Sequence, residues 1–246
     1  MKIVAIIPSR YGSSRLIAKP LMKIKKIPMI QRVYERVRQA KSITDVFVAT
    51  DDRRIADVVE GFGGRAVMTT AENRSGTDRV AEAAAKIGLS DSDIVVNVQG
   101  DQPLIEPSCL DEVVVPFYRI PDLTMTTLAY TIVDPREITN PKDCKVTFGK
   151  DGFALYFSRS PIPCARDAGT RFDTYKHLGI YAYTVKFLKI FSNLPTGRLE
   201  SIEKLEQNRV LENGYRILVV ITEHDSPEVD VPEDIERIES ILNGKR

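Results

Sequence analysis

Residues 3–21 read IVAIIPSRYGSSRLIAKPL, and the first strand of the fold can be assigned from them. Residues 3–7 are an unbroken apolar run, which predicts a β-strand that is buried on both faces. Pro8 ends the run, and a polar loop follows it. Strands buried on both faces are typical of parallel sheets that helices cover on either side. This stretch therefore predicts an α/β fold whose first strand lies inside the sheet.

The first half of the chain repeats this pattern. Apolar runs predict further strands at residues 45–50, 66–68 and 93–98. Between them, apolar residues at helical spacing predict helices at residues 28–41, 52–62 and 77–87. Repeated β-α-β order predicts a Rossmann-like, doubly wound sheet with helices on both faces.

The second half has a different pattern, which predicts a mixed sheet. We expect strands at residues 124–133, 144–148, 153–157, 179–183 and 217–221, and helices at residues 185–192, 201–213 and 233–243. There is no internal repeat, low-complexity tract or linker in the sequence. We therefore expect residues 1–246 to form a single domain.

The composition excludes several classes of function. The 246 residues carry 35 basic and 34 acidic side chains, so no broad positive surface for nucleic acid is expected. Cys109, Cys144 and Cys164 lie far apart and read as reduced thiols, while His177 and His224 are too few for a His-rich metal centre. No apolar stretch approaches the roughly 20 residues of a membrane span, so we expect a cytoplasmic protein.

The loop after the first strand carries Arg10, Arg15 and Lys19 beside the Gly-Ser-Ser run at residues 12–14. Small residues let backbone N–H groups approach phosphate oxygens, and the three cations can neutralise a polyphosphate. A solvated basic loop is the competing interpretation. Ligands in doubly wound sheets bind at the carboxyl ends of strands, which favours phosphate here. The glycine signatures of dinucleotide-binding and P-loop proteins do not occur.

A second loop, Gly100-Asp101-Gln102-Pro103, follows the strand predicted at residues 93–98. An Asp at that point suits a Mg²⁺ ion beside bound phosphates. Gly-Asp-x-Pro is equally good turn chemistry. The residues themselves leave both interpretations open.

Taken in order, eight segments resemble one known family, the 3-deoxy-manno-octulosonate (Kdo) cytidylyltransferases, or CMP-Kdo synthetases. The resemblance runs from Ile6 to Asp234, and it rests on residues 8–21, 49–51, 75–79, 97–103, 154–163, 176–181, 205–207 and 229–234. It implies a Mg²⁺-dependent enzyme that transfers CMP from CTP to Kdo and releases pyrophosphate, for lipopolysaccharide biosynthesis. It also implies a homodimer in which residues 1–120 mainly bind CTP and residues 121–230 mainly bind the sugar and form the dimer contact.

The resemblance assigns roles to individual residues. Nucleotide binding is implied for Arg10, Ser13, Arg15, Lys19, Ser75, Gly76 and Arg79. Sugar binding is implied for Gln99, Arg159, His177, Glu206 and Gln207. Mg²⁺ binding is implied for Asp101 and Asp230, which with Arg15 and Lys19 form the catalytic set.

Each of these side chains could instead have an ordinary structural role. Arg159 could pair with a nearby acid, and His177 could be a hydrogen-bonded core residue. Glu206 and Gln207 could lie on a solvated helix face, and Asp230 could belong to a helix start. It is the ordered family pattern, rather than spacing, that favours the functional roles.

Three positions depart from the family pattern. Ala18 replaces a Gly, which restricts the backbone beside Lys19, and Val231 replaces a Thr, which removes a helix-capping hydroxyl. Gln102 replaces a Glu, which removes a negative charge beside the metal. The 8-amino analogue of Kdo is the rival substrate, but we expect Kdo to be used and residue 102 not to contact C8. Two different functions also stay open, a nucleotidyltransferase for neutral sugar 1-phosphates and a non-catalytic nucleotide-binding module.

Overall fold

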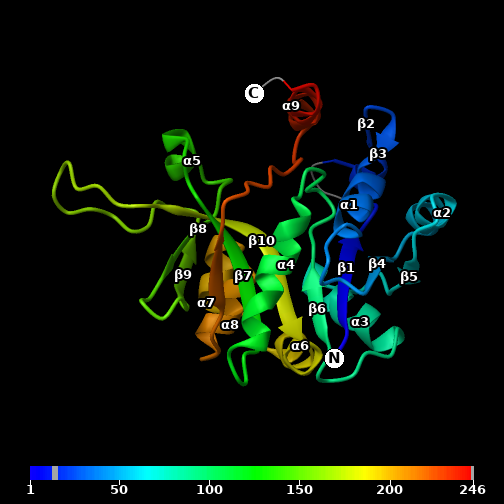
Figure 1. Cartoon of the computed structure of the whole chain (residues 1–246), viewed down its shortest axis with the longest axis horizontal. Helices are drawn as coiled ribbons and strands as arrows, with labels where there is room; N and C mark the ends of the chain where they lie inside the picture. The colour runs from blue at the N-terminus through cyan, green and yellow to red at the C-terminus, as the bar shows by residue number, and fades with distance from the viewer. Residues whose placement is uncertain (13–15, 245–246) are drawn as a thin grey trace.

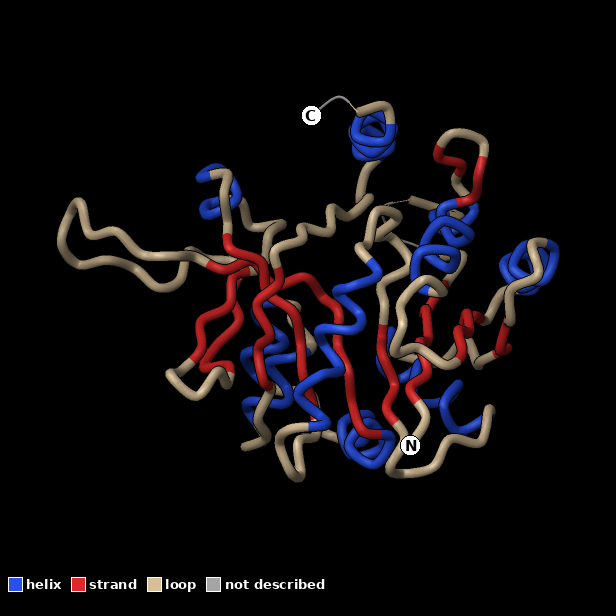
Figure 2. Tube along the Cα trace, viewed as in Figure 1, coloured by secondary structure: helices blue, strands red, loops and turns tan. Residues whose placement is uncertain are grey.

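The computed structural model describes residues 1–12 and 16–244. In this part of the chain a nine-stranded sheet has helices packed on both faces (Figures 1 and 2). The main path of the sheet runs β11 (Leu218–Thr222), β7 (Met125–Thr131), β10 (Tyr175–Thr184), β6 (Ile94–Asn97), β1 (Ile3–Ser9), β4 (Asp45–Thr50) and β5 (Ala66–Met68). Beside β10 lies β8 (Lys145–Phe148), which in turn pairs with β9 (Ala154–Ser158).

The pairing confirms a parallel first half and a mixed second half. β1 is parallel to both β4 and β6, and β4 is parallel to β5. β10 is antiparallel to β6 and to β7, whereas β11 is parallel to β7. Because β10 pairs directly with β6, one continuous sheet spans both halves of the chain.

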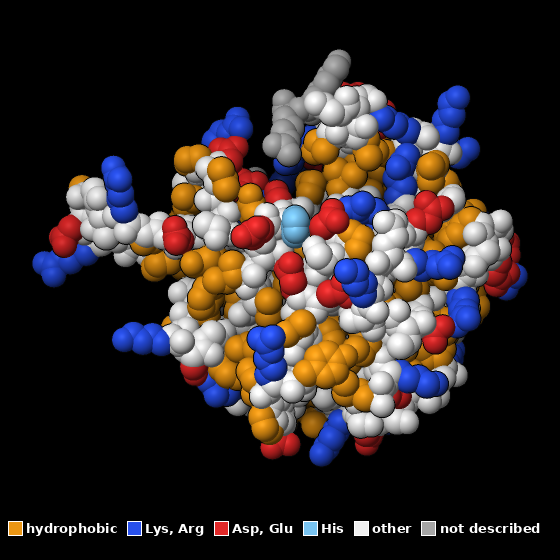
Figure 3. All heavy atoms as spheres, in the orientation of Figure 1, with side chains coloured by type: hydrophobic (Ala, Val, Ile, Leu, Met, Phe, Trp, Pro, Cys, Tyr) orange, Lys and Arg blue, Asp and Glu red, His pale blue; other side chains and the backbone are white. Residues whose placement is uncertain are grey.

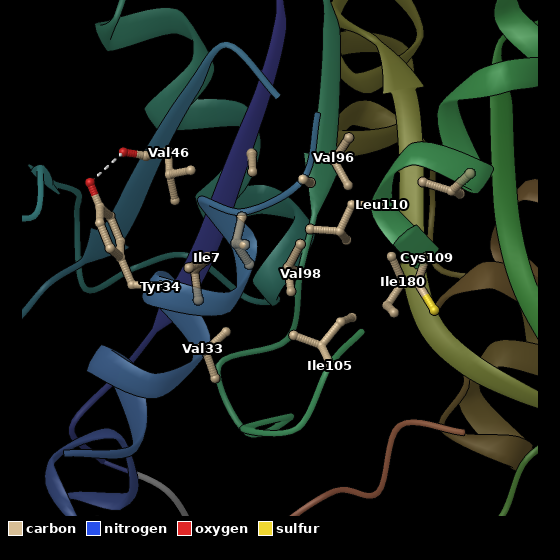
Figure 4. Packing of buried hydrophobic residues seen from close by; sticks show 14 of the residues in the cluster. Ile7, Val33, Tyr34, Val46, Val96, Val98, Ile105, Cys109, Leu110 and Ile180 are labelled. Carbon is tan, nitrogen blue, oxygen red and sulfur yellow. Dashed lines mark hydrogen bonds between the residues drawn. The ribbon is translucent and has the colours of Figure 1, made fainter. Parts of the chain in front are cut away.

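Both faces of the sheet are buried, which explains the unbroken apolar run in β1. Ile3, Ala5 and Ile7 pack with α1 (Met29–Val37), α2 (Arg53–Gly61) and α4 (Pro107–Val114). Figure 4 shows part of this cluster. Val4 and Ile6 point to the opposite face, against α3 (Gly76–Lys86), α6 (Val185–Asn193) and α8 (Gln207–Glu212). Full burial of such side chains contributes about 1.5–3 kcal/mol each.

The single helix predicted at residues 201–213 is wrong. The structure has α7 (Arg198–Glu203) and α8, separated by Lys204 in the left-handed conformation with φ of 54°. The Lys204 N–H donates to the Glu200 carbonyl and ends α7 there. A left-handed residue cannot continue a right-handed helix, so the chain turns and starts α8 in a new direction.

Several short elements are absent from the sequence prediction. They are α4, α5 (Pro135–Thr139), the 3₁₀ turns η1 (Lys19–Leu21) and η2 (Val115–Tyr118), and a hairpin of β2 (Lys23–Ile24) and β3 (Ile27–Pro28). Because Pro28 belongs to this hairpin, α1 begins at Met29. The last helix, α9 (Pro232–Leu242), lies close to its predicted position.

Two of the family departures have visible consequences. Ala18 adopts φ of 58° and ψ of 25°, the left-handed region that favours glycine. Val231 precedes α9 and has no capping side chain, so the Asp234 carboxylate accepts the N–H groups of Asp230 and Val231 at 2.8 and 3.0 Å.

Across residues 1–12 and 16–244, every helix is too short or too polar to cross a membrane.

Candidate active site

The carboxyl ends of β1 and β6 meet closely at one edge of the sheet. A Cβ atom at Gly100 would lie 3.1 Å from the Ser9 Oγ and 3.3 Å from the Pro8 carbonyl oxygen. A side chain at this position would crowd the loop after β1, so glycine favours the close approach of the two loops. Directly after Gly100, the Asp101 carbonyl accepts the N–H of Val229 at 3.0 Å, which brings the loop before α9 to the same place.

This approach places two carboxylates around one ammonium group. The Lys19 Nζ lies 2.6 Å from Asp101 Oδ2 and 3.2 Å from Asp230 Oδ1. Burial by itself lowers the pKa of Lys19, but the adjacent carboxylates, Asp101 foremost, raise it above its ordinary value. Lys19 is therefore a cation held by two anions.

The same two carboxylates have the chemistry of a Mg²⁺ site. Their oxygens converge on one position that already holds a cation. Among residues 1–12 and 16–244, no cluster of three or more His, Cys, Asp or Glu side chains suits a metal. Mg²⁺ is usually bound by one or two carboxylates together with substrate phosphates and water. Asp101 and Asp230 therefore fit the predicted ion, with the nucleotide supplying further ligands.

A cavity of about 270 Å³ lies on one side of this carboxylate pair. It is lined by five of the residues predicted to bind the nucleotide: Arg10, Lys19, Ser75, Gly76 and Arg79. The N-terminus of α3 forms part of its wall, and the Ser75 Oγ caps that helix by accepting the N–H of Asp78 at 3.1 Å. Free N–H groups at a helix N-terminus bind anions, so this wall is suited to phosphate.

Two more features of the nucleotide cavity involve the arginines Arg79 and Arg74. Arg79 is buried, and its guanidinium donates to Thr69 Oγ1 at 2.5 Å and to Asp51 Oδ2 at 3.0 Å. Arg74 also lines the cavity, and sequence reasoning misses it because nothing in its polar surroundings distinguishes it from a solvated arginine. The predicted residues Ser13 and Arg15 lie outside the described residues.

A larger cavity of about 650 Å³ lies on the other side of the carboxylate pair, between α5 and α9. It is lined by the predicted sugar residues Gln99, Arg159, His177 and Gln207. Acidic side chains gather on the face of the molecule between these two helices (Figure 3). Gln99, Asp101 and Asp230 line both cavities, so the carboxylate pair stands at their junction.

Arg159 is held in place by backbone carbonyls rather than by an acid side chain. Its Nε donates to the Glu203 carbonyl at 2.7 Å, and its Nη1 donates to the Pro141 carbonyl at 2.9 Å. The Glu203 carboxylate accepts the Arg159 backbone N–H. The guanidinium is thus fixed at the cavity wall with N–H groups left over for a ligand.

His177 and Gln207 form a buried polar group in the wall of the larger cavity. The His177 Nε2 lies 2.8 Å from Thr127 Oγ1, and the Gln207 Oε1 accepts the Tyr181 hydroxyl at 3.1 Å. Burial lowers the pKa of His177 to about 3. This histidine is therefore neutral at ordinary pH and can act as a hydrogen-bonding group but not as a proton shuttle.

Glu206 lies outside the linings of both cavities. Its carboxylate accepts the hydroxyls of Ser75 at 2.7 Å and Thr77 at 2.9 Å, at the start of α3. Burial raises its pKa above the ordinary value, and the two hydroxyls oppose that shift. Its position connects α8 to the nucleotide helix, which differs from the sugar contact that the resemblance implies.

Two further cavity residues escape the sequence reasoning. Lys176 is buried and pairs with Glu137 and Asp225, each at 2.8 Å. The Glu228 carboxylate lines the larger cavity and accepts the Gln102 Nε2 at 3.3 Å. Burial, followed by the charges of Asp101 and Asp230, raises its pKa to about 8. The one sequence feature that could have indicated Glu228 as a site residue is its position two residues before the predicted metal ligand Asp230.

Comparison with known proteins agrees with this geometry. The cytidylyltransferase family model matches residues 4–217. A 3-deoxy-manno-octulosonate cytidylyltransferase of Desulfosudis oleivorans is 65% identical over 242 residues, which cover 98% of each chain. An 8-amino-3,8-dideoxy-manno-octulosonate cytidylyltransferase of Shewanella amazonensis is 53% identical over 243 residues, covering 98% of this chain and 99% of the relative.

Solved structures give the same result. A CMP:2-keto-3-deoxy-manno-octonic acid synthetase complexed with CTP matches with a TM-score of 0.93 at 40% identity, and the match covers 100% of both chains. A 4-diphosphocytidyl-2C-methyl-D-erythritol synthase shares the fold, with a TM-score of 0.66 at 13% identity and coverage of 98% of both chains. The chain is thus a cytidylyltransferase, and it belongs to the 3-deoxy-manno-octulosonate cytidylyltransferase family.

Proposed function

We propose that the protein transfers CMP from CTP to Kdo, giving CMP-Kdo and pyrophosphate for lipopolysaccharide biosynthesis. One observation carries this proposal: a phosphate-suited cavity and a larger polar cavity meet at the Asp101–Asp230 pair. The relative from Desulfosudis oleivorans and the solved synthetase complexed with CTP support the choice of substrates. Residues 1–120 would mainly bind CTP, and residues 121–230 would mainly bind the sugar.

The protein's part in the reaction is to position the substrates and neutralise charge. Arg10, Lys19 and the N-terminus of α3 would hold the triphosphate, with Ser13 and Arg15 as further proposed contacts. The anomeric C2 hydroxyl of the sugar would approach the α-phosphorus from the larger cavity, opposite the departing pyrophosphate. Mg²⁺ on Asp101 and Asp230 would supply a charge that orients the phosphates and favours ionisation of the attacking hydroxyl.

The acidic sugar requires a cation in its cavity, and Arg159 is our candidate. Its carbonyl contacts fix the plane of the guanidinium, so its remaining N–H groups can bind a carboxylate in a defined geometry. Neutral His177 and the Gln207 amide would hydrogen-bond hydroxyls. Glu206 would act on the nucleotide side, by holding Ser75 and Thr77.

The 8-amino analogue is the second candidate substrate, and one observation favours it. Glu228 places a carboxylate in the larger cavity, and none of the described cations forms an ion pair with it. An ammonium group bound there would favour the charged form of Glu228 and would pair with it. Gln102, by contrast, is fully buried, donates to the Leu178 carbonyl at 2.6 Å and does not line the cavity. This burial supports the expectation that residue 102 does not contact C8.

Pyrophosphate release tests the proposal. The purified protein with Mg²⁺ and CTP should release pyrophosphate with Kdo but not with neutral sugar 1-phosphates, and EDTA should abolish the release. Turnover in excess EDTA would exclude a role for Mg²⁺ in the reaction. Binding of CTP without turnover would instead identify the protein as a non-catalytic nucleotide-binding module. Equal concentrations of Kdo and its 8-amino analogue should show a higher kcat/KM for Kdo. A more than tenfold preference for the amino sugar would reverse the assignment.

We further propose that the protein acts in the cytoplasm as a homodimer. Residues 159–174 project from the body as a long arm between β9 and β10 (Figure 1). Phe172 on the arm and Leu155 on β9 are 46% and 66% exposed, and a second copy would cover such apolar side chains. Light scattering on the purified protein should give twice the chain mass of 27.6 kDa.

A further inference from the structure

Lys19 has two binding partners in the site, and it cannot satisfy both at once. Its ammonium contacts both of the carboxylates that are suited to the metal, at 2.6 and 3.2 Å. Lys19 also lines the cavity that is suited to the triphosphate. We propose that Lys19 and the divalent cation compete for the position between Asp101 and Asp230, and that the nucleotide phosphates decide the outcome by drawing Lys19 away.

Geometry makes the two occupants exclusive. Mg²⁺ lies about 2.1 Å from its ligand oxygens. An ion at that distance from Asp101 Oδ2 and also near Asp230 Oδ1 would overlap the place of the Lys19 Nζ. Two cations that close would also repel each other strongly. The metal therefore requires the ammonium to leave the position between the two carboxylates.

The side chain can leave while the backbone stays. Lys19 is the first residue of η1, where its N–H donates to the Leu16 carbonyl at 3.3 Å and its carbonyl accepts the Met22 N–H at 3.2 Å. Its flexible four-carbon stem can then carry the ammonium from the carboxylates into the nucleotide cavity. A triphosphate there offers more negative charge than the two carboxylates together.

Metal and nucleotide should consequently bind cooperatively. The protein supplies two carboxylates, and the Lys19 ammonium stays in contact with both until a polyphosphate binds. By thermodynamic linkage, the factor by which bound nucleotide raises the affinity for the metal equals the factor by which bound metal raises the affinity for the nucleotide. This inference rests on the proposed metal-dependent nucleotidyl transfer, but its test needs neither sugar nor turnover.

The test is a titration of the nucleotide-free protein with Mn²⁺, in which electron paramagnetic resonance measures the free ion. Lys19→Met should lower the Kd for Mn²⁺ at least tenfold relative to wild type. The double variant Lys19→Met/Asp101→Asn should lose that gain. Lys23→Met, which removes an exposed lysine four residues away, should bind Mn²⁺ as wild type does.

Circular dichroism and thermal melting would check the fold of each variant, and Lys19→Gln would replace Lys19→Met if the latter does not fold. A folded Lys19 variant that binds Mn²⁺ no more tightly than wild type would overturn the competition. A gain that survives the Asp101→Asn substitution would also overturn it. Pyrophosphate release by the wild type with CTP and Kdo tests the proposed function separately, so the two ideas can fail independently.

Discussion

Replacement of Ala18 by glycine should stabilise the protein. Ala18 adopts φ of 58° and ψ of 25°, and its N–H donates to the Tyr11 carbonyl at 2.9 Å. The left-handed conformation costs an L-residue with a Cβ atom roughly 1–2 kcal/mol. Glycine removes this cost but adds about 0.4–1 kcal/mol of conformational freedom to the unfolded chain.

The balance is a gain of about 0.8 kcal/mol in the free energy of unfolding. For a chain of this size, each kcal/mol shifts the midpoint by about 2–4 °C, so the expected rise in Tm is about 2–3 °C. Thermal melting followed by circular dichroism, at one protein concentration for all variants, measures it. The Tyr11 contact involves only backbone atoms and is unchanged by the substitution.

Ala81→Gly is the matched control, because Ala81 lies inside α3 in an ordinary helical conformation. Glycine there should lower the free energy of unfolding by about 1 kcal/mol. If Ala18→Gly raises the free energy of unfolding and Ala81→Gly lowers it, the difference is due to the backbone conformation at the two positions, because the chemical change is the same. If Ala18→Gly lowers Tm as much as Ala81→Gly does, the left-handed strain at residue 18 is refuted.

Four further results are expected. Asp230→Asn should lower kcat in the pyrophosphate assay at least a hundredfold, since loss of a metal ligand removes about 3 kcal/mol or more from the transition state, while Tm stays within a few degrees; near-normal kcat would confine Asp230 to the start of α9. Arg159→Lys should raise the KM for the acidic sugar at least tenfold and leave the KM for CTP unchanged, because the point charge of an ammonium does not replace the planar, two-pronged guanidinium. A raised KM for CTP alone would instead assign Arg159 to nucleotide binding. The folded-state pKa of Glu228, about 8, lies above its ordinary value, so the stability it contributes at low pH is lost as pH rises through 8. Glu228→Gln should therefore raise Tm relative to wild type progressively from about pH 5 to about pH 8, with no further rise above that, and a difference independent of pH would contradict the shift. Val231→Thr restores a capping hydroxyl before α9 and should add about 1 kcal/mol, or about 2–4 °C in Tm; no change would mean that Asp234 already satisfies that end.

The core of the fold could be predicted because local pattern and burial agree there. An unbroken apolar run such as residues 3–7 is compatible with burial on both faces, and the structure places it inside the sheet. The break at Lys204 had no such signal, because apolar residues keep helical spacing on both sides of it. Glu203 makes tertiary contacts with Ser158 and with the Arg159 backbone, and contacts of that kind are not encoded in spacing.

The site was predictable only in part, because several of its residues are far apart in the sequence and are brought together by tertiary contacts. Asp101 follows a strand, so its position at the sheet edge could be inferred from the chain itself. Asp230 is 129 residues further on, and only the ordered family pattern connected the two. Glu228 belongs to an acidic run before a helix, a pattern typical of solvated side chains, yet its carboxylate lines the cavity. Convergence over such distances follows from the tertiary path of the chain.

Glu206 and Gln207 are consecutive in sequence, yet one holds the start of α3 and the other belongs to the wall of the larger cavity. A change of backbone at this pair would disturb both halves of the site together. Evolution of new sugar preferences is therefore constrained here, and it should be freer in the segment of residues 226–228, which lines the same cavity. Directed evolution toward other acidic sugars should randomise that segment and leave residues 206 and 207 intact.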